Sequence, residues 1–531
     1  MTHYDAIIVG CGPVGGVLAN LLAAEGLSVC VVEKFREVYP RPRAIVLDWE
    51  VMRALQYCGI AHALHPSTRP HPGTDFVGID GGIIKIFDPL PPPYALGWPA
   101  TSTFIQPTLE RMLRRALERR PHAAMRLGWT LAGFQEGTGG VSATIREGER
   151  GRSEAITADV LIGCDGANSD VRRSLGFALD DYQFDEWWIV VDAWQLCDTE
   201  LPRKTTQYCW PSRPATFVVG PGNLRRWEIK LLPSEHPRDF DNPDRLRAVM
   251  AAFVDVSCFD IWRSATYRFA ARVGDRWASR RIFLAGDAVH QMPPFLGQGL
   301  CAGVRDAFNL AWKIVFAKRH GWSEALLASY EIERKPHVAT VIRHAKEFGL
   351  IIGEMDEARA RARDRVLRAE LHEGRMVTSR QAFIPDLAGG ILGGDALSGS
   401  LMVQPEVADE DRTRLMDDLT PMAFLYVTDG QEPQAWMSPH AAFWKRLGGE
   451  RIAFVAPETG GVDGVRAMTE TGRIFAGWAD ARSIRAAIVR PDRYVYAAVT
   501  DAQDLADKLQ RLAAQLGVSR SSGQHGDAGS R

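Results

Sequence analysis

The segment Gly286 to Gly299, GDAVHQMPPFLGQG, brings together residue types that can hold a polar ligand against a stiff loop. Asp287 follows the apolar run Ile282 to Ala285, a predicted buried strand, so its carboxylate can accept hydrogen bonds from hydroxyl groups at the strand end. The paired prolines stiffen the chain, and Gly297 and Gly299 leave room for the edge of a ligand. A helix is predicted directly after Gly299, and its free N–H groups favour negative charge beside them. Taken alone, the segment is compatible both with a ligand-holding loop and with an ordinary strand-turn-helix connection that contains prolines.

A second glycine turn lies near the N-terminus. Gly10 to Gly15, GCGPVG, separates a predicted strand ending at Val9 from a predicted helix, Val17 to Ala24, and a second strand ends at Glu33. In such a turn the first glycine permits the bend, the second lets the backbone approach a pyrophosphate, and the third allows close packing. An acid about 20 residues further on can accept hydrogen bonds from a ribose. The pattern predicts dinucleotide binding without distinguishing NAD from FAD. The residues concerned are Gly10, Gly12, Pro13, Gly15 and Glu33.

A third turn of this kind occurs in mid-chain. The segment ADVLIGCDGANSD, Ala158 to Asp170, runs from an apolar strand into Gly163 to Gly166, and a helix is predicted from Val171. Asp165 stands at the end of that strand. We expect the three turns, far apart in the sequence, to meet around one nucleotide.

The composition limits the class of protein. The chain has 531 residues, enough for two or three domains. Its 63 Lys and Arg nearly balance 65 Asp and Glu, so no summed field points to nucleic acid or to an anionic membrane. The eight cysteines are scattered without metal-ligand spacing, which argues against a disulfide scaffold and a metal site and favours a reducing compartment. No apolar run approaches the length of a membrane span. We expect a soluble cytoplasmic protein whose partner is a small molecule.

The predicted elements change character along the chain. A strand-helix-strand unit at the N-terminus is followed, from about residue 180 to 270, by short tryptophan-rich strands such as RRWEIKLL, where Trp227 and Ile229 alternate with Glu228 and Lys230 as in a half-buried antiparallel strand. The charged stretch 356–375 predicts a solvated helix. A glycine-rich link, 389–400, precedes a region of alternating strands and helices.

The three turns together resemble those of single-component class A flavoprotein aromatic monooxygenases of the para-hydroxybenzoate hydroxylase type. The resemblance lies in the N-terminal GxGxxG, the mid-chain CDGANSDVR and the later RIFLAGDAVHQMPP. It implies FAD as cofactor, NADH or NADPH as co-substrate, and hydroxylation of an aromatic ring by dioxygen through a flavin C4a-hydroperoxide. It assigns Asp287 to the FAD ribose, and Asp165 to both FAD and the nicotinamide. Because no second GxGxxG follows a strand, we expect the nicotinamide to bind without a Rossmann domain of its own.

Other segments, among them PRAIVLDWE, WWIVVDAW, RRWEIKLL and IVRPDRYV, resemble the 3-(3-hydroxyphenyl)propionate hydroxylase branch of that family. This implies that Arg43 and Gln106 contact the cofactor, and that the C-terminal region resembles the thioredoxin-like domain of phenol hydroxylases without its redox cysteines. Pro294 and Gly299 are expected to position the flavin at the catalytic centre, with no general acid or base assigned. The family often has Asn where this chain has Cys301, so the role of that position stays open. The remaining expected cofactor contacts are Lys34, Gly286, Gly297 and Leu300.

The predicted fold class is α/β: a discontinuous Rossmann-like FAD-binding domain, an inserted antiparallel-sheet substrate domain and a C-terminal thioredoxin-like α/β domain. The expected bounds are 1–75, 100–178 and 271–390 for the FAD-binding domain, 76–99 and 179–270 for the substrate sheet, 400–516 for the thioredoxin-like domain, and 517–531 for a disordered tail.

Trp188, Tyr208 and Arg225 are candidates for the substrate site, against the competing interpretations of core packing for the aromatic residues and exposure for the arginine. The function expected is hydroxylation of a phenolic or other electron-rich ring, for example that of a hydroxyphenylpropionate, by a homodimer. The alternatives are a Baeyer-Villiger or epoxidising flavoprotein on the same fold, and a flavoprotein that binds an aromatic compound without turnover.

Overall fold

The computed structural model describes residues 1–430, 435–456 and 464–519. These form two compact units. The first unit comprises 1–94, 98–307 and 337–385, and the second comprises 95–97, 308–336 and the chain from 386 onward. The chain passes between the units within two long helices, α7 (Gly299–His320) and α8 (Glu324–Gly353).

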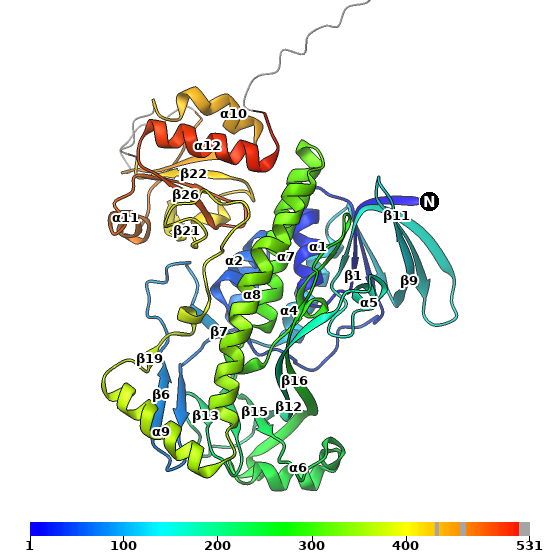
Figure 1. The fold of residues 1–531 in the computed structure, drawn as a ribbon, viewed down its shortest axis with the longest axis vertical. Helices are drawn as coiled ribbons and strands as arrows, with labels where there is room; N and C mark the ends of the chain where they lie inside the picture. The colour runs from blue at the N-terminus through cyan, green and yellow to red at the C-terminus, as the bar shows by residue number, and fades with distance from the viewer. Residues whose placement is uncertain (431–434, 457–463, 520–531) are drawn as a thin grey trace, which may run out of the picture. The chain divides into compact units, whose positions relative to one another are not determined.

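The first unit contains a seven-stranded sheet with a parallel centre (Figure 1). The apolar runs Ala6–Val9 and Val160–Ile162 are buried on both faces of the sheet, which explains why they do not alternate with polar residues. Helix α1 (Pro13–Ala24) packs against α4 (Gln106–Glu118). The strands, in spatial order, are β8 (Ala123–Leu127), β2 (Val29–Glu33), β1 (Thr2–Val9), β11 (Ser153–Gly163), β10 (Val141–Glu147) and β9 (Trp129–Glu136), with β17 (Ile282–Leu284) also paired to β11.

The second sheet of this unit has nine strands, mostly antiparallel. One face, with Val191, Trp227 and Ile229, packs on α6 (Pro243–Met250) and forms a hydrophobic core. The strands are β18 (His290–Gln291), β16 (Phe259–Gly274), β12 (Leu179–Gln195), β15 (Leu224–Lys230), β14 (Ala215–Val219), β13 (Thr205–Tyr208), β5 (Thr74–Val77), β6 (Ile83–Phe87) and β19 (Val377–Thr378).

The opposite face of this sheet differs from what the alternation predicted. Glu228 and Lys230 were expected on the solvent side of a half-buried strand, but both are buried. Lys230 bonds to the carbonyl of Gly353 at the end of α8, so protein covers this face as well. The prediction was wrong here because alternation reports a difference between two faces, not exposure to water.

The second unit contains a five-stranded sheet and a hairpin, with helices α10 (Ala441–Arg446), α11 (Ile474–Asp480) and α12 (Ala502–Leu516). This mixed sheet completes the predicted α/β fold class, which is confirmed. Of the predicted tail 517–531, residues 520–531 lie outside the described residues. The strands are β24 (Arg466–Met468), β23 (Glu450–Phe454), β22 (Leu425–Thr428), β25 (Ala486–Val489) and β26 (Val495–Val499), with the hairpin β20 (Glu406–Asp409) and β21 (Arg412–Leu415).

Shorter elements of the first unit complete the chain. The charged stretch forms the predicted helix, α9 (Glu357–His372), although its Asp364 is buried and binds the backbone of Ile79. The others are α2 (Trp49–Tyr57), α3 (Ala61–Leu64), α5 (Asp170–Ser174), β3 (Val46–Asp48), β4 (Arg69–Pro70) and β7 (Thr101–Thr103).

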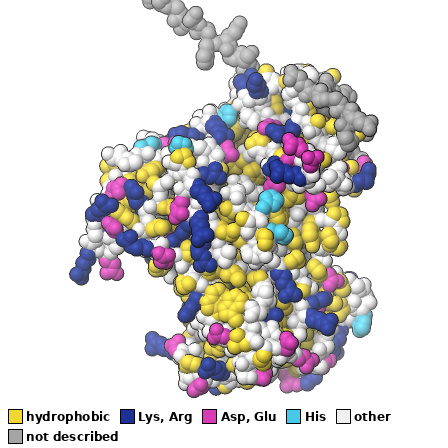
Figure 2. Space-filling view, turned by 180° about the vertical axis from the view of Figure 1, so that it is seen from behind, with side chains coloured by type: hydrophobic (Ala, Val, Ile, Leu, Met, Phe, Trp, Pro, Cys, Tyr) yellow, Lys and Arg dark blue, Asp and Glu magenta, His cyan; other side chains and the backbone are white. Residues whose placement is uncertain are grey.

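The structure also tests what the sequence predicted about cysteine pairing and surface charge. A disulfide joins Cys197 and Cys258, a pair that the scattered spacing did not lead us to expect. Lys and Arg side chains lie among Asp and Glu on the face shown in Figure 2, in keeping with the balanced composition. Among the described helices, none has the length and apolar character needed to cross a bilayer.

Candidate active site

The three glycine turns meet at one edge of the seven-stranded sheet. Strands β1, β11 and β17 are parallel neighbours, with Val9 beside Gly163 and Gly163 beside Leu284, so the turns that follow them leave the sheet side by side. A Cβ added to Gly10 would lie 2.4 Å from the carbonyl oxygen of Cys164, and one added to Gly286 would lie 2.9 Å from Val14. The structure therefore brings together the three segments that the sequence separates by more than a hundred residues each.

The glycines of the first turn have two different roles. Gly10 has a φ of +100°, and a Cβ on Gly15 would meet the carbonyl oxygen of Gly10 at 2.0 Å, so both positions require the absence of a side chain. Gly12 differs, because no heavy atom of the described protein lies within 4 Å of the place that a Cβ would take there. Gly12 precedes Pro13 at the start of α1 and has no side chain to cap the helix. Its open space adjoins free helix N–H groups, a combination suited to an anionic group.

Two carboxylates beside these turns have acceptor capacity to spare. Oδ2 of Asp165 accepts hydrogen bonds from the N–H groups of Asp170 and Val171, while its Oδ1 is buried without a partner in the described chain. Asp287 accepts no side-chain hydrogen bond from any described residue; it is accessible to solvent, yet the surrounding protein raises its pKa by desolvation, against the charges of His290 and Arg43. Because the Asp287 carboxylate reaches solvent but has protein atoms on most sides, it lines a recess in the surface. The buried Oδ1 of Asp165 requires a donor from a ligand or water.

Glu33 and the residues near it form the far end of this site. The Glu33 carboxylate accepts hydrogen bonds from the N–H groups of Cys11 (2.7 Å) and Phe35 (2.8 Å), which fixes it beside the first turn. Lys34 is exposed.

Gln106, at the start of α4, is buried, and its Oε1 accepts hydrogen bonds from the backbone N–H groups of Arg43 (3.1 Å) and Ala44 (2.6 Å), while its Nε2 donates to Glu110. The Arg43 side chain is exposed and lies over the ring of Tyr39. Gln106 thus holds the Arg43 segment in place.

The loop after Asp287 is fixed by its backbone and by buried neighbours. Pro294 begins a short 3-10 turn, Gly297 is left-handed with a φ of +68°, and α7 begins at Gly299, followed by the half-buried Leu300. The Sγ of Cys301 donates to the Gly297 carbonyl. A thiol at this position therefore holds the loop that precedes α7.

His290 has a structural explanation that the sequence did not supply. Its Nε2 lies 2.7 Å from Oδ2 of Asp306 on α7, and the same oxygen accepts the N–H of Gly286 at 3.1 Å. Asp306 therefore joins the first part of the Gly286–Gly299 loop to α7.

The loop faces the nine-stranded sheet. Phe295 packs edge-on against Trp188, with ring centroids 5.2 Å apart, and against Phe269 and Phe184. Trp188 is fully buried among these rings, as the competing interpretation of core packing expected, and it lies on the side of the sheet that faces the loop. Tyr208 and Arg225 instead lie on the α6 side of the sheet, because their register partners Ala215 and Val219 belong to the hydrophobic core. The structure does not bring them together with Trp188.

Buried charges on the loop-facing side of the sheet were not predicted. Arg226 and Arg263 both bind Asp192, and they also donate to the carbonyls of Arg43 (2.8 Å) and Pro42 (2.6 Å). The sheet therefore holds the Pro42–Arg43 segment through a buried ion cluster. The usable sequence signal was the position of these residues on the same side of their strands as Glu228.

Glu228 is expected to reduce the stability of the protein. Burial raises the pKa of its carboxyl to about 6 against the lowering effect of Arg226, from an ordinary value of 4.5. Because the folded state holds this proton more tightly than the unfolded state, stability falls as the pH rises from 4.5 to 6 and stays lower above it. Glu228→Gln should therefore raise the free energy of unfolding by about 2 kcal/mol at pH 8 and by little at pH 4.5, as measured by urea denaturation. An equal gain in the free energy of unfolding at pH 8 and at pH 4.5 would show that the charge of Glu228 is not what destabilises the protein.

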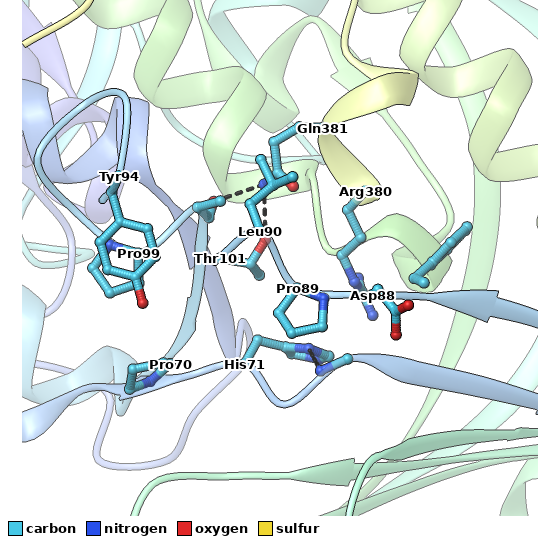
Figure 3. A pocket seen from close by; sticks show the side chains of 13 residues that line it. Pro70, His71, Asp88, Pro89, Leu90, Tyr94, Pro99, Thr101, Arg380 and Gln381 are labelled. Atoms are coloured by element: carbon cyan, nitrogen blue, oxygen red, sulfur yellow. Dashed lines mark hydrogen bonds between the residues drawn. The ribbon is translucent and has the colours of Figure 1, made fainter. Parts of the chain in front are cut away.

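One pocket of the first unit lies beside this sheet (Figure 3). It is a small, partly open recess between the end of β6 and the segment 88–101, and Arg380 and His71 are among its lining residues. Gln381 is held at its rim by hydrogen bonds to the Ala100 carbonyl and the Thr101 hydroxyl. Arg380 lines this pocket and also contacts the Pro294–Gly299 loop, because its guanidinium donates to the Leu296 carbonyl at 3.0 Å.

Comparisons with known proteins agree with this architecture. A family described as FAD binding domain matches residues 3–345, and one described as HcaD C-terminal domain matches residues 399–515. A probable NADH-specific resorcinol 4-hydroxylase of Rhodococcus jostii (strain RHA1) is 34% identical, over 96% of this chain and 95% of the relative. A 3-(3-hydroxy-phenyl)propionate/3-hydroxycinnamic acid hydroxylase of Burkholderia vietnamiensis (strain G4 / LMG 22486) is 33% identical, over 94% of each chain.

A solved structure of the flavin-dependent monooxygenase PieE in complex with FAD and substrate has the same fold, with a TM-score of 0.79 at 21% identity over 97% of this chain and 99% of that one. The fold, the converging turns and these relatives define an FAD-dependent aromatic hydroxylase. The chain belongs to the FAD binding domain family, as the resemblance of its three turns predicted.

Proposed function

We propose that the three converging turns hold FAD and that the enzyme uses NADH or NADPH to hydroxylate a phenolic ring held between the Pro294–Gly299 loop and the nine-stranded sheet. The observation that carries the assignment of the site is the meeting of Gly10, Cys164 and Gly286 around carboxylate oxygens that receive no hydrogen bond from the described residues. Gly12 and the start of α1 suit the pyrophosphate, and Glu33 suits a ribose. Asp165 and Asp287 supply acceptors for the remaining hydroxyl groups. The proposal includes the division into an FAD domain, an inserted sheet domain and a C-terminal domain.

The chemistry that bound FAD supplies is hydride uptake from the nicotinamide and activation of dioxygen. The chain's own contribution is positioning and the exclusion of water. Pro294 and Gly297 fix the loop, and Gly299 begins α7 with free N–H groups that favour negative charge beside them. On the other side, Trp188 and Phe295 form an aromatic wall. These residues hold a flat ring close to the loop and keep water away from it.

The substrate class follows from the relatives and from this wall. The two relatives described above are named for resorcinol and for hydroxyphenylpropionate, which share a phenolic hydroxyl. We extend that shared group, and no particular compound, to this chain. The proposal also comprises dioxygen as co-substrate, a homodimer and a cytoplasmic location, which rest on the resemblance and on the composition.

Purified protein tests the proposal directly. We expect it to be yellow, to contain FAD, and to oxidise NADH or NADPH faster when a phenol is added, with one oxygen atom appearing on a ring carbon. An inserted ester oxygen would identify a Baeyer-Villiger enzyme instead. FAD binding without any phenol-stimulated oxidation would identify a flavoprotein that binds without turnover.

Asp287→Ala is expected to weaken FAD binding by about 1 to 3 kcal/mol, roughly tenfold to a hundredfold in the dissociation constant, because a surrounded acceptor for ligand hydroxyls is lost. The measurement is a fluorescence titration of the FAD-free protein with FAD. Asp244→Ala on α6, whose carboxylate is almost fully exposed, serves as the matched control and should bind FAD as the wild type does. Equal affinities in all three proteins would show that the Asp287 loop does not contact the cofactor.

A further inference from the structure

The loop-facing side of the nine-stranded sheet carries a row of three polar side chains: Gln207 on β13, Thr216 on β14 and Glu228 on β15. Gln207 is the register partner of Thr216, and Thr216 is the register partner of Glu228, so the three lie across adjacent strands on one face. All three are buried. We call them the polar row.

The carboxylate of Glu228 lacks the hydrogen bonds that a buried charge needs. Within the described chain it accepts none, and its nearest cation is NH1 of Arg226 at 3.8 Å. That arginine is already engaged, with Nε and NH2 on Asp192 and NH1 on the Arg43 carbonyl. Thr216 is no substitute, because its hydroxyl donates to Gln207. A side chain only 7% exposed thus retains unused acceptor capacity on the loop-facing side of the sheet.

Near Glu228 lies a buried arginine, Arg380, one of whose N–H groups lacks an acceptor in the described residues. Arg380 is buried; NH1 donates to the Leu296 carbonyl and NH2 to the Thr74 hydroxyl (2.9 Å), while its Nε has no partner in the described residues. Arg380 and Glu228 are close enough for each to stabilise the charge of the other, yet no direct ion pair joins them in the part of the chain that is described. A ligand group that satisfies both residues must donate a hydrogen bond to the Glu228 carboxylate and accept one from Nε of Arg380.

We propose that Glu228 and Arg380 recognise the phenolic hydroxyl of the substrate, whose O–H donates to the Glu228 carboxylate and whose oxygen accepts from Nε of Arg380. This assignment rests on the proposed function and names two residues that position the ring. A hydroxyl carries one donor and two acceptor lone pairs, so it satisfies both groups at once. Arg380 also lines the pocket of Figure 3.

The pair also has a consequence for reactivity. In the hydroxylation that bound FAD and dioxygen would drive, a C–O bond would form on the ring as an O–O bond of the oxidant breaks. The phenolic O–H bond breaks in the same step: its proton moves to an oxygen of Glu228, and its electron pair supplies electron density to the ring as a C=O bond forms. When the ring regains its aromaticity, the hydroxylated carbon releases its proton to water and Glu228 returns its own proton to the phenolic oxygen. Arg380 stabilises the negative charge in between.

The test compares probes with and without the hydroxyl in the FAD-loaded enzyme. Resorcinol and 1,3-dimethoxybenzene are titrated against the wild type, Glu228→Gln and Arg380→Lys, with dissociation constants read from flavin absorbance changes. We expect the wild type to bind resorcinol at least about tenfold more tightly than the dimethyl ether, and each variant to reduce that preference to about twofold or less. The wild type and Glu228→Gln should also differ more in kcat than in KM, because the proton acceptor is lost in the variant.

Glu235→Gln is the matched control, because Glu235 is equally buried in the same unit but is paired with Arg213 and Arg245 away from the loop. It should keep the wild-type preference. If Arg380→Lys does not fold, because it disturbs the bonds to Leu296 and Thr74, the preference measured in Glu228→Gln decides alone. A wild type that does not discriminate between the probes, or variants that keep its full preference, would overturn the inference while FAD binding and hydroxylation stand. A wild type that binds no FAD would overturn the proposed function instead.

Discussion

Gly15→Ala is expected to cost the first unit about 3 kcal/mol in its free energy of unfolding, the upper end of overpacking effects. A Cβ at this position would lie 2.0 Å from the Gly10 carbonyl oxygen and 3.1 Å from the Cys164 side chain. The first of these atoms belongs to the backbone, which is held between β1 and β11, so it has no flexible side chain to move aside. Urea denaturation of the FAD-free protein measures the loss.

Gly12→Ala provides the matched comparison in the same turn. No described atom lies within 4 Å of the position of its Cβ, and its φ of -72° suits any residue, so the free energy of unfolding should change by less than about 0.5 kcal/mol. FAD affinity should nevertheless fall by on the order of tenfold, because the methyl group occupies the space through which the backbone approaches a pyrophosphate. If Gly12→Ala is destabilised as strongly as Gly15→Ala, the division of roles between these glycines is wrong.

Glu333→Gln is expected to destabilise the second unit by about 3 to 5 kcal/mol, because it breaks a buried ionic cluster and leaves cations without their partner. Glu333 on α8 binds Lys313 of α7 at 2.8 Å and Arg490 at 2.7 Å, and Arg490 also binds Asp492. All four side chains are buried. Burial alone raises the pKa of Glu333, but Arg490 and Lys313 prevail and lower it to about 2. Burial lowers the pKa of Lys313 to about 8.

The sign of the pH effect follows from the lowered pKa. The stabilisation by Glu333 is present above its ordinary pKa of 4.5 and is lost as the pH falls from 4.5 towards 2. The difference between wild type and Glu333→Gln in urea denaturation should therefore shrink over that range. Asp480→Asn in the same unit, whose carboxylate is 70% exposed and paired only with the exposed Arg473, should change stability by less than about 0.5 kcal/mol. A comparable loss in both variants would contradict the buried-cluster explanation.

The convergence of the turns was predictable because it depends on short-range rules. A buried strand, a glycine turn and a following helix are encoded within about 15 residues, and parallel strands bring such turns to one edge. The strand that ends at Val9 appears where the sequence placed it. The resemblance of the three turns to those of flavoprotein aromatic monooxygenases then indicated the family, which the comparisons confirm.

The rest of the site depends on long-range placement that periodicity does not report. Alternation separated Trp227 from Glu228 but did not say that Glu228 faces a second layer of protein rather than water. Tyr208 was a reasonable aromatic candidate, and only the register with Ala215 shows that it belongs to the other face. Arg380 comes from a short turn that follows no recognisable motif, more than 80 residues after the Leu296 carbonyl it binds.

Helix α7 links the cofactor end of the protein to the cluster around Glu333. It begins at Gly299, directly after the Pro294–Gly297 turn, and thirteen residues later its Trp312 donates to Asp492 and Lys313 pairs with Glu333. The turn between β25 and β26, which carries Arg490 and Asp492, thus takes part in the ionic cluster on a helix whose first residue belongs to the proposed flavin site. We therefore expect that, in evolution, the C-terminal region was not exchanged independently between homologues. An exchange would have to include Trp312 and Lys313 of α7 to keep the ionic cluster.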